Sequence, residues 1–199
     1  MPSRRRVPRA EQRRVITDVR VLAALGHPVR ARLLGHLVEL GPSTATECAA
    51  DAGVSPSACS YHLRHLERFG LVERVQDASD GRNRPWRAVA TGYSIGPSPS
   101  THDIVTRTAT FAAVSASVAA TNDLAETFLA GVLALSDEWQ DAAEFNSYGL
   151  AVDADELRTL TAAIDALVRP YLAATRTDAP PGARNVHVTV QAFPRDVPR

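Results

Sequence analysis

The stretch TATECAADAGVSPSACSYHLRHLERFGLVER, residues 44–74, carries the signals of two short helices joined by a tight turn. Thr44 and Glu47 have the spacing of a capping box, in which each side chain accepts a bond from the other residue's backbone N–H. Gly53 is placed to end that helix, because glycine readily takes the left-handed conformation found just past helix ends. The sequence therefore predicts a first helix between Thr44 and Gly53.

A second helix follows the turn at once. Ser55 is a favourable N-cap, and Pro56 suits the first helical position, where a backbone N–H has no helical partner. Gly70 marks the end of this helix, which we expect over residues 56–69. Its apolar residues follow the spacing i, i+4, i+7, so that side is expected to face a core: Cys59, Leu63 and Leu66.

The opposite side of the second helix is polar. It carries hydroxyl groups and one guanidinium, which bind base edges and phosphates, on Ser57, Ser60, Tyr61 and Arg64. A capped, half-polar helix that a tight turn holds against a helix behind it is the helix-turn-helix arrangement for entering a major groove. The stretch therefore predicts a module that binds double-stranded DNA.

The flanking sequence extends this motif to a winged helix-turn-helix. Upstream, residues 21–25 and 28–40 have helical spacing. Downstream, strands are expected over residues 71–76 and 84–90, with a polar turn between them. The wing, residues 77–88, carries three arginines that we expect to contact backbone phosphates, although any hairpin needs a soluble tip: Arg82, Arg84 and Arg87.

Residues 19–93 resemble the ArsR-type winged-helix regulators of bacteria. The resemblance rests on VLAALGHPVRARLLGHL at 21–37, VSPSACSYHLRHLERFGLVER at 54–74 and DGRNRPWRA at 80–88. It implies a homodimer that binds a DNA palindrome and represses or activates transcription. Metal sensors of this family carry a C-x-C pair in the first helix of the motif. Here that segment contains only Cys48, so the resemblance does not extend to metal sensing.

Charge is divided unevenly along this chain of 199 residues, whose formal net charge is zero. Residues 1–96 hold 15 Arg against 9 Asp and Glu, whereas residues 97–199 hold 7 Arg against 13 Asp and Glu. A basic half attracts a polyanion and an acidic half repels it, so we expect one side of the protein to approach DNA.

Other features of the sequence favour a cytoplasmic protein without membrane contact. Its two cysteines, Cys48 and Cys59, cannot form a disulfide framework of the secreted kind. A secretory signal requires an apolar stretch after its N-terminal charges, and no such stretch follows the charges here. The longest apolar run, residues 128–135, is far shorter than the roughly 20 residues of a membrane-spanning helix.

Composition changes divide the chain into four expected regions. A flexible Arg-rich arm at 1–14 precedes the DNA-binding domain at 15–95, and a Pro/Ser linker at 96–101 leads to a helical dimerisation region at 102–199. This last region is loosely similar to extensions of ArsR-like regulators from actinobacteria, and an effector could also bind there.

The expected fold class is mainly α with small β elements. Beyond the linker, residues 102–135 have helical spacing, with an interruption near Asn122 and Asp123. Asp153-x-x-Glu156 is a second capping box and opens an amphipathic helix. Strands expected at 148–152 and 186–193 complete a strand-helix-strand unit, and the pairing of these strands, within one chain or between two, stays open.

The sequence favours neither a metal site nor catalysis. Cys59, His62 and His65 lie three residues apart on one helix, but Cys59 is expected to face the core, where a free cysteine is a small apolar residue. No phosphate-binding loop, nucleophile motif or zinc-protease motif is present. We therefore expect no metal, no cofactor and no enzyme activity.

The sequence leaves open whether the protein binds a small-molecule effector. The C-terminal half offers aromatic residues that would line an apolar pocket or build a dimer core, the second being favoured: Phe111, Phe128, Trp139, Phe145, Tyr148 and Tyr171. Three alternatives remain beside a constitutive regulator: an effector-responsive repressor, a winged-helix module that docks other proteins, and a sequence-blind DNA coat, against which the acidic half argues.

Overall fold

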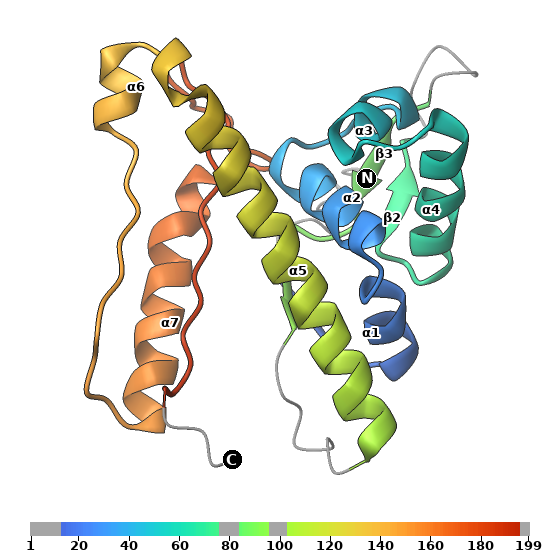
Figure 1. The fold of residues 1–199 in the computed structure, drawn as a ribbon, viewed down its shortest axis with the longest axis horizontal. Coiled ribbons are helices and arrows are strands. Elements are labelled where there is room, and N and C mark those ends of the chain that lie inside the picture. The colour runs from blue at the N-terminus through green and yellow to red at the C-terminus, as the bar shows by residue number, and fades with distance from the viewer. Residues whose placement is uncertain (1–12, 76–83, 96–102, 196–199) are drawn as a thin grey trace, which may run out of the picture.

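The structure is a computed structural model that describes residues 13–75, 84–95 and 103–195. It is mainly helical, with a winged helix-turn-helix domain followed by a helical C-terminal region, so the expected fold class is confirmed (Figure 1). The helices are α1 Val19–Leu25, α2 Pro28–Glu39, α3 Ala45–Ala52, α4 Pro56–Arg68, α5 Ile104–Gly131, α6 Asp137–Asp141 and α7 Ala154–Val168. The strands are β1 Arg14–Ile16, β2 Val72–Arg74, β3 Trp86–Ala88 and β4 Tyr93–Ile95.

The two helices of the motif begin where their capping residues predict. The Glu47 carboxylate accepts from the Thr44 N–H at 2.7 Å and the Thr44 hydroxyl accepts from the Glu47 N–H at 3.3 Å, which completes the capping box of α3. Gly53 follows α3 with φ 64°, a conformation that glycine adopts without steric cost. Ser55 Oγ accepts from the Ala58 N–H at 3.2 Å and caps α4. These local bonds fix the turn between α3 and α4.

The base of the expected wing is present. β2 and β3 pair antiparallel with Glu73 opposite Arg87, and Ser43 forms an isolated bridge with Trp86. Both strands are shorter than the expected segments at 71–76 and 84–90. The expected turn, residues 77–83, lies wholly outside the described residues.

A second pairing joins the start of the domain to its end, and the sequence does not predict it. β1 runs parallel to β4, with Val15 opposite Ser94. Arg14, which the sequence assigns to the flexible arm, begins β1 and donates from its guanidinium to the Gly70 carbonyl at 2.9 Å. The residues of the arm before Arg13 lie outside the described part of the chain.

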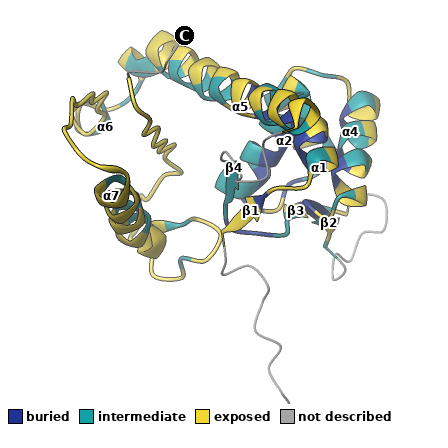
Figure 2. Cartoon of the chain, turned by 90° about the horizontal axis from the view of Figure 1, so that it is seen from below, coloured by how far each residue is buried: buried dark blue, intermediate teal, exposed yellow. Residues whose placement is uncertain are grey.

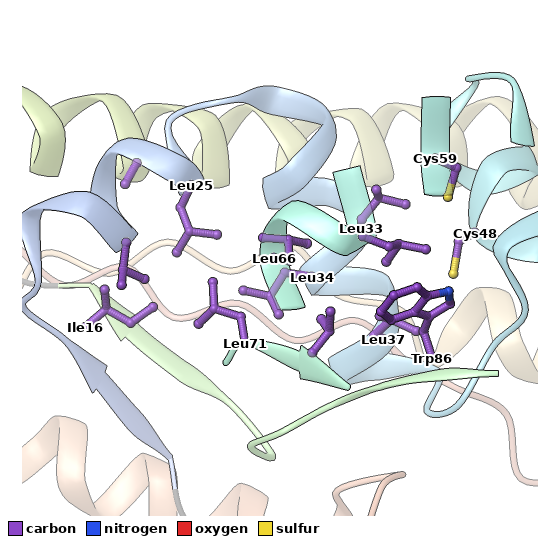
Figure 3. Close-up of a cluster of buried hydrophobic side chains, with 14 of the residues drawn as sticks. Ile16, Leu25, Leu33, Leu34, Leu37, Cys48, Cys59, Leu66, Leu71 and Trp86 are labelled. Atoms are coloured by element: carbon purple, nitrogen blue, oxygen red, sulfur yellow. The ribbon is translucent and has the colours of Figure 1, made fainter. Parts of the chain in front are cut away.

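One apolar core fills the winged domain. Side chains from α1, α2, α3, α4 and the strands point toward one another there (Figure 3). Trp86 is 1% exposed and forms part of this core. Its other large, fully buried members are Leu22, Leu33, Leu37, Leu63, Leu66, Leu71, Val72, Cys48 and Cys59. The core therefore locks α4 from its inner side, as the i, i+4, i+7 pattern predicts.

Helix α5 packs closely on α1 through small residues, and buries Ala109, Ala113 and Ala116. A Cβ on Gly26 would lie 2.9 Å from the Cβ of Ala112, so glycine permits this approach. The interruption expected near Asn122 and Asp123 is wrong: α5 continues through both residues to Gly131. Asn122 and Asp123 are poor helix formers, but the alanine-rich turns on either side favour the helix enough to continue it.

The C-terminal region buries none of its described residues beyond Ala116 (Figure 2). The expected amphipathic helix is present as α7, with its capping box from Asp153 to Glu156 complete. The strand-helix-strand unit is not formed. Residues 148–152 and 186–193 flank α7 in the chain but belong to no strand, because neither has a strand beside it to complete a hydrogen-bonded ladder.

Segment Ile104–Ala134, which contains α5, has the length and apolar composition of a membrane-crossing helix, with a mean hydropathy of 1.2 over its most apolar window. This differs from the expectation based on uninterrupted apolar runs, because Thr, Ser and Ala residues lengthen the window without adding charge. Length and composition alone are weak grounds for a span.

Candidate nucleic-acid interface

The polar side of α4 faces outward, as expected. Ser57, Tyr61 and Arg64 are exposed and Ser60 is half-buried, whereas the inner side of the same helix is wholly buried. Tyr61 alone is 64% exposed, although it is a large aromatic residue. The structure therefore brings all four residues to one side of a helix at the edge of the domain (Figure 1).

Two of these side chains are held by contacts within the helix. Arg64 Nε donates to the Ser60 carbonyl at 3.1 Å, and the hydroxyls of Ser57 and Ser55 lie 3.1 Å apart. The bond lays the Arg64 guanidinium along α4. Only Nε is used in this bond, and the terminal nitrogens of a guanidinium are further donors of the kind that bind a guanine edge.

The three expected wing arginines differ in their surroundings. Arg82 lies outside the described residues, and Arg84 is exposed. Arg87 pairs across the hairpin with Glu73, its Nε and terminal nitrogen lying 2.9 and 2.7 Å from one carboxylate oxygen. The charge of Arg87 is therefore partly balanced by the Glu73 carboxylate.

A basic and aromatic cluster beside α4 was missed by sequence reasoning. The ring centroids of His27 and His62 lie 4.7 Å apart, and the Tyr61 ring meets His62 edge to face at 5.3 Å and lies tilted 6.5 Å from His65. Burial, reinforced by His27, Arg30 and neighbouring imidazoles, lowers the pKa of His62. The pKa of His65 is also lowered, by burial first and then by the charges of Arg30 and Arg68.

Arg30 is the charged member of this cluster. Its Nε is buried and has no hydrogen-bond partner within the described residues, and burial lowers its pKa. It belongs to α2 but faces α4 across the motif. The sequence places Arg30 in the first turn of the helix that begins at Pro28. Local sequence patterns do not show that this turn lies next to α4.

The aromatic residues proposed for a pocket do not converge in the single chain. Phe128 and Phe145 meet with ring centroids 6.0 Å apart. Trp139 and Tyr171 instead lie under arginines, Arg184 at 5.6 Å and Arg176 at 5.1 Å from the respective ring centroids. The remaining two, Phe111 and Tyr148, are 76% and 77% exposed.

A cavity of about 230 Å³ lies elsewhere, between α2, α3, α5 and residues 185–187. Arg32 Nε is 3.3 Å from an Asp51 carboxylate oxygen, and His36 Nδ1 is 3.5 Å from the same oxygen. Across the cavity, the His187 ring donates to Glu39 at 3.1 Å, which raises the pKa of His187. Its polar lining groups are thus largely paired with one another, while Ala31, Leu40, Ala120, Leu124 and Val186 supply apolar walls.

The residues weighed as metal ligands are separated by the fold. Cys59 faces the core, whereas His62 and His65 face Arg30 and His27. Burial raises the pKa of Cys59 to about 11 and that of Cys48 to about 12, so neither thiol ionises at neutral pH. Within the described ranges, no group of three ligating side chains is close enough to hold a metal.

Comparisons with known proteins agree with this geometry. Residues 25–75 match the family described as "Helix-turn-helix domain". No curated protein matches the chain significantly. The match and the winged fold together support a helix-turn-helix domain of the DNA-binding kind within the winged domain.

Among solved structures, the chain is similar to a variant of MepR from S. aureus, with 20% identity, a TM-score of 0.28, and coverage of 70% of this chain and 78% of that one. It is also similar to transcriptional regulator Tm0710 from Thermotoga maritima, with 13% identity, a TM-score of 0.30, and coverage of 71% and 78%. Scores of this size reflect a loose superposition.

Proposed function

We propose that this protein is a homodimeric ArsR-type transcriptional regulator of the cytoplasm, in which each subunit inserts α4 into the major groove of a palindromic operator. The proposal rests chiefly on the difference in burial between the two sides of α4. Its inner side is wholly buried, while Ser57, Tyr61 and Arg64 stand exposed on a capped helix. Two-fold symmetry places the half-sites about 34–36 Å apart, one turn of DNA.

Each group on this surface has a proposed role. Ser57, Ser60, Tyr61 and Arg64 contact bases or phosphates in the groove, and Arg82 and Arg84 hold the backbone at the wing, with Arg87 a lesser contributor. We assign the DNA-binding domain to residues 15–95 and the dimerisation region to residues 102–199, with the arm 1–14 and the linker 96–101 at their borders. The acidic C-terminal region keeps the remainder of the protein away from DNA.

The test begins with selection of bound fragments from genomic DNA by the purified protein at physiological salt. An enriched inverted repeat supports a dimeric, sequence-specific regulator. Binding without enrichment, and with steep loss as salt rises, contradicts it and favours the sequence-blind coat. No DNA binding at all favours the protein-docking module.

Once the DNA sequence that the protein binds is known, two substitutions test which residues contact the DNA. Arg64→Ala is expected to cost about 1–3 kcal/mol of binding and to relax the preference at one base pair. Arg84→Ala is expected to reduce the slope of log affinity against log salt by about one unit without changing the preferred sequence. Arg158→Ala, at an exposed arginine on α7, is the control and leaves both properties unchanged. Unchanged binding by Arg64→Ala removes this residue from the interface.

The effector-responsive form of this regulator is a second candidate, favoured by the cavity between α2, α3, α5 and residues 185–187. A molecule bound there touches both the DNA-binding domain and the C-terminal region. Products of the genes beside the selected operator supply the molecules to test. One that releases the operator from the wild-type protein but not from Ala120→Phe, which narrows the cavity, supports this function; equal release from both proteins contradicts it.

A further inference from the structure

The two extended segments of the C-terminal region, 145–152 and 186–193, have the composition of strands but lack the pairing. Val186, Val188 and Val190 alternate along the second segment and are 62%, 62% and 51% exposed. In the first segment, Tyr148, Leu150 and Val152 alternate in the same way. Alternating β-branched and aromatic residues are typical of a strand with one side on a core.

This surface is also unusually free of charge. Residues 103–195 hold 6 Arg against 12 Asp and Glu, yet neither segment contains a single Arg, Asp or Glu. Proteins keep exposed strand edges apart with charged residues or proline; neither segment contains Arg, Asp, Glu or proline, and the one histidine, His187, is bonded to Glu39. The acidic surroundings exclude DNA as the occupant of the surface. An apolar, uncharged strand pairs instead with another strand.

Helix α7 is equally uncovered. It has no buried residue, and its apolar side includes Leu160, 37% exposed, and Leu167, 73% exposed. A helix of 15 residues whose apolar side is at most half-buried is weakly stabilised, because helices in proteins are stabilised chiefly by packing of that side. Within the described residues, neither α7 nor the two segments are therefore covered by a second layer of structure.

The amount of exposed surface fits a second copy of the chain. The large apolar residues of the two segments alone expose on the order of 800 Å², which is the area that each partner contributes to a standard interface. A second copy supplies an equal uncharged strand, whereas in the described part of the single chain the other uncharged segment, 145–152, is not paired with residues 186–193.

We propose that residues 186–193 pair antiparallel with the same residues of a second copy, and so form the centre of an intermolecular sheet. Residues 148–152 flank this sheet and α7 covers it. The inference rests on the homodimer of the proposed function and deepens it by naming the surface. A two-fold axis perpendicular to a sheet relates two copies of a strand in antiparallel order, and it places one residue opposite its own copy.

That geometry is directly testable by disulfide formation. Single cysteines are introduced at each position from 186 to 192 in turn, with Val188→Cys at the centre, and the dimer is oxidised under native conditions. The natural Cys48 and Cys59 stay silent because they are buried and protonated at neutral pH. Val15→Cys is the control, since Val15 is 66% exposed, close to the exposure of Val188, but lies in the winged domain.

A disulfide-linked dimer is expected with a sharp maximum at one position of the segment and none at Val15. The backbone amides of residues 186–193 are expected to exchange slowly in the dimer and rapidly after dilution to monomer. Val188→Pro, which removes a backbone donor from the ladder, is expected to raise the dimer dissociation constant about tenfold or more in sedimentation experiments.

Two outcomes overturn the inference in different ways. A stable dimer without cross-linking anywhere in the segment, and with unprotected amides, keeps the homodimer of the proposed function but removes the sheet. Amides that stay protected in a monomer show that the two segments pair within one chain. That result, together with a monomer at every concentration, removes the homodimer as well.

Discussion

The winged domain and the C-terminal region contain similar kinds of apolar residue and use them in opposite ways. In the first, Leu, Val and Trp side chains from several elements converge on one core. In the second, Leu, Val and Phe side chains lie on isolated elements and stay exposed. Apolar content therefore creates a core only where a second layer faces the first, and the C-terminal region lacks that layer in the single chain.

The largest difference between the two regions is expected at leucines. Leu33 in α2 is 0% exposed, whereas Leu133, just after α5, is 87% exposed. Leu33→Ala is expected to lower the free energy of unfolding by about 2–5 kcal/mol, because it leaves a cavity in a packed core. Leu133→Ala is expected to change it by no more than about 0.5 kcal/mol. Urea unfolding followed by circular dichroism measures both.

Equal losses for the two leucines would contradict the comparison, since they would show that Leu133 is packed as tightly as Leu33. A loss at Leu133 that disappears on dilution would sharpen it instead, because it would place Leu133 in a contact between subunits.

An intermediate effect is expected where the two regions touch. Gly26→Ala places a Cβ 2.9 Å from the Cβ of Ala112 and forces α5 away from α1, at a cost of about 1–3 kcal/mol of unfolding free energy. Gly35→Ala is the matched control, since the nearest atom is a flexible Glu39 oxygen at 3.9 Å. Because alanine favours a helix interior over glycine, this control is expected to stabilise the protein by up to about 1 kcal/mol. Thermal unfolding separates the two, and a neutral Gly26→Ala would mean that α5 does not rest on α1.

The smallest effect is a dependence on pH that belongs to the winged domain. Burial and neighbouring cations lower the pKa of His62, so between this value and the unfolded value of about 6.5 the unfolded chain binds more protons. Stability attributable to His62 is therefore lost as the pH falls below about 6.5. His62→Gln is expected to reduce the fall in unfolding free energy between pH 7.5 and pH 5.5.

His187 is the corresponding histidine of the C-terminal region, and its contribution to stability changes with pH in the opposite direction. The bond to Glu39 raises the pKa of His187, so its stabilisation is complete below about 6.5 and is lost as the pH rises through the raised value. His187→Gln is therefore expected to steepen the fall in stability toward acid pH. Identical pH profiles for the two variants would show that neither histidine is coupled to folding.

Local signals account for what the sequence predicts correctly. The capping residues Thr44 and Ser55, the stop at Gly53 and the spacing of Cys59, Leu63 and Leu66 each act within a few residues, and each is found in the structure as expected. The outward side of α4 follows from the same period. This is why the motif, and the candidate interface on it, are readable from the sequence.

Contacts between distant segments account for the failures. The pairing of β1 with β4, and the approach of Arg30 to α4, depend on residues far apart in the chain, for which local patterns contain no signal. The error at residues 148–152 and 186–193 has another cause. Their alternation reports a preference for strand, but a strand exists only with a partner, and a single sequence does not show which chain provides it.

Among the residues that the structure describes, every buried one lies at or before Ala116, and this has a consequence for biosynthesis. A polypeptide emerges from the ribosome N-terminus first, and domains fold as units as they emerge. The core of the winged domain is complete once the first half of α5 is outside the exit tunnel, before residues 117–195 are available. The DNA-binding end of the molecule is then folded while its remaining surfaces are still being made, and their association becomes a later step whose rate depends on concentration.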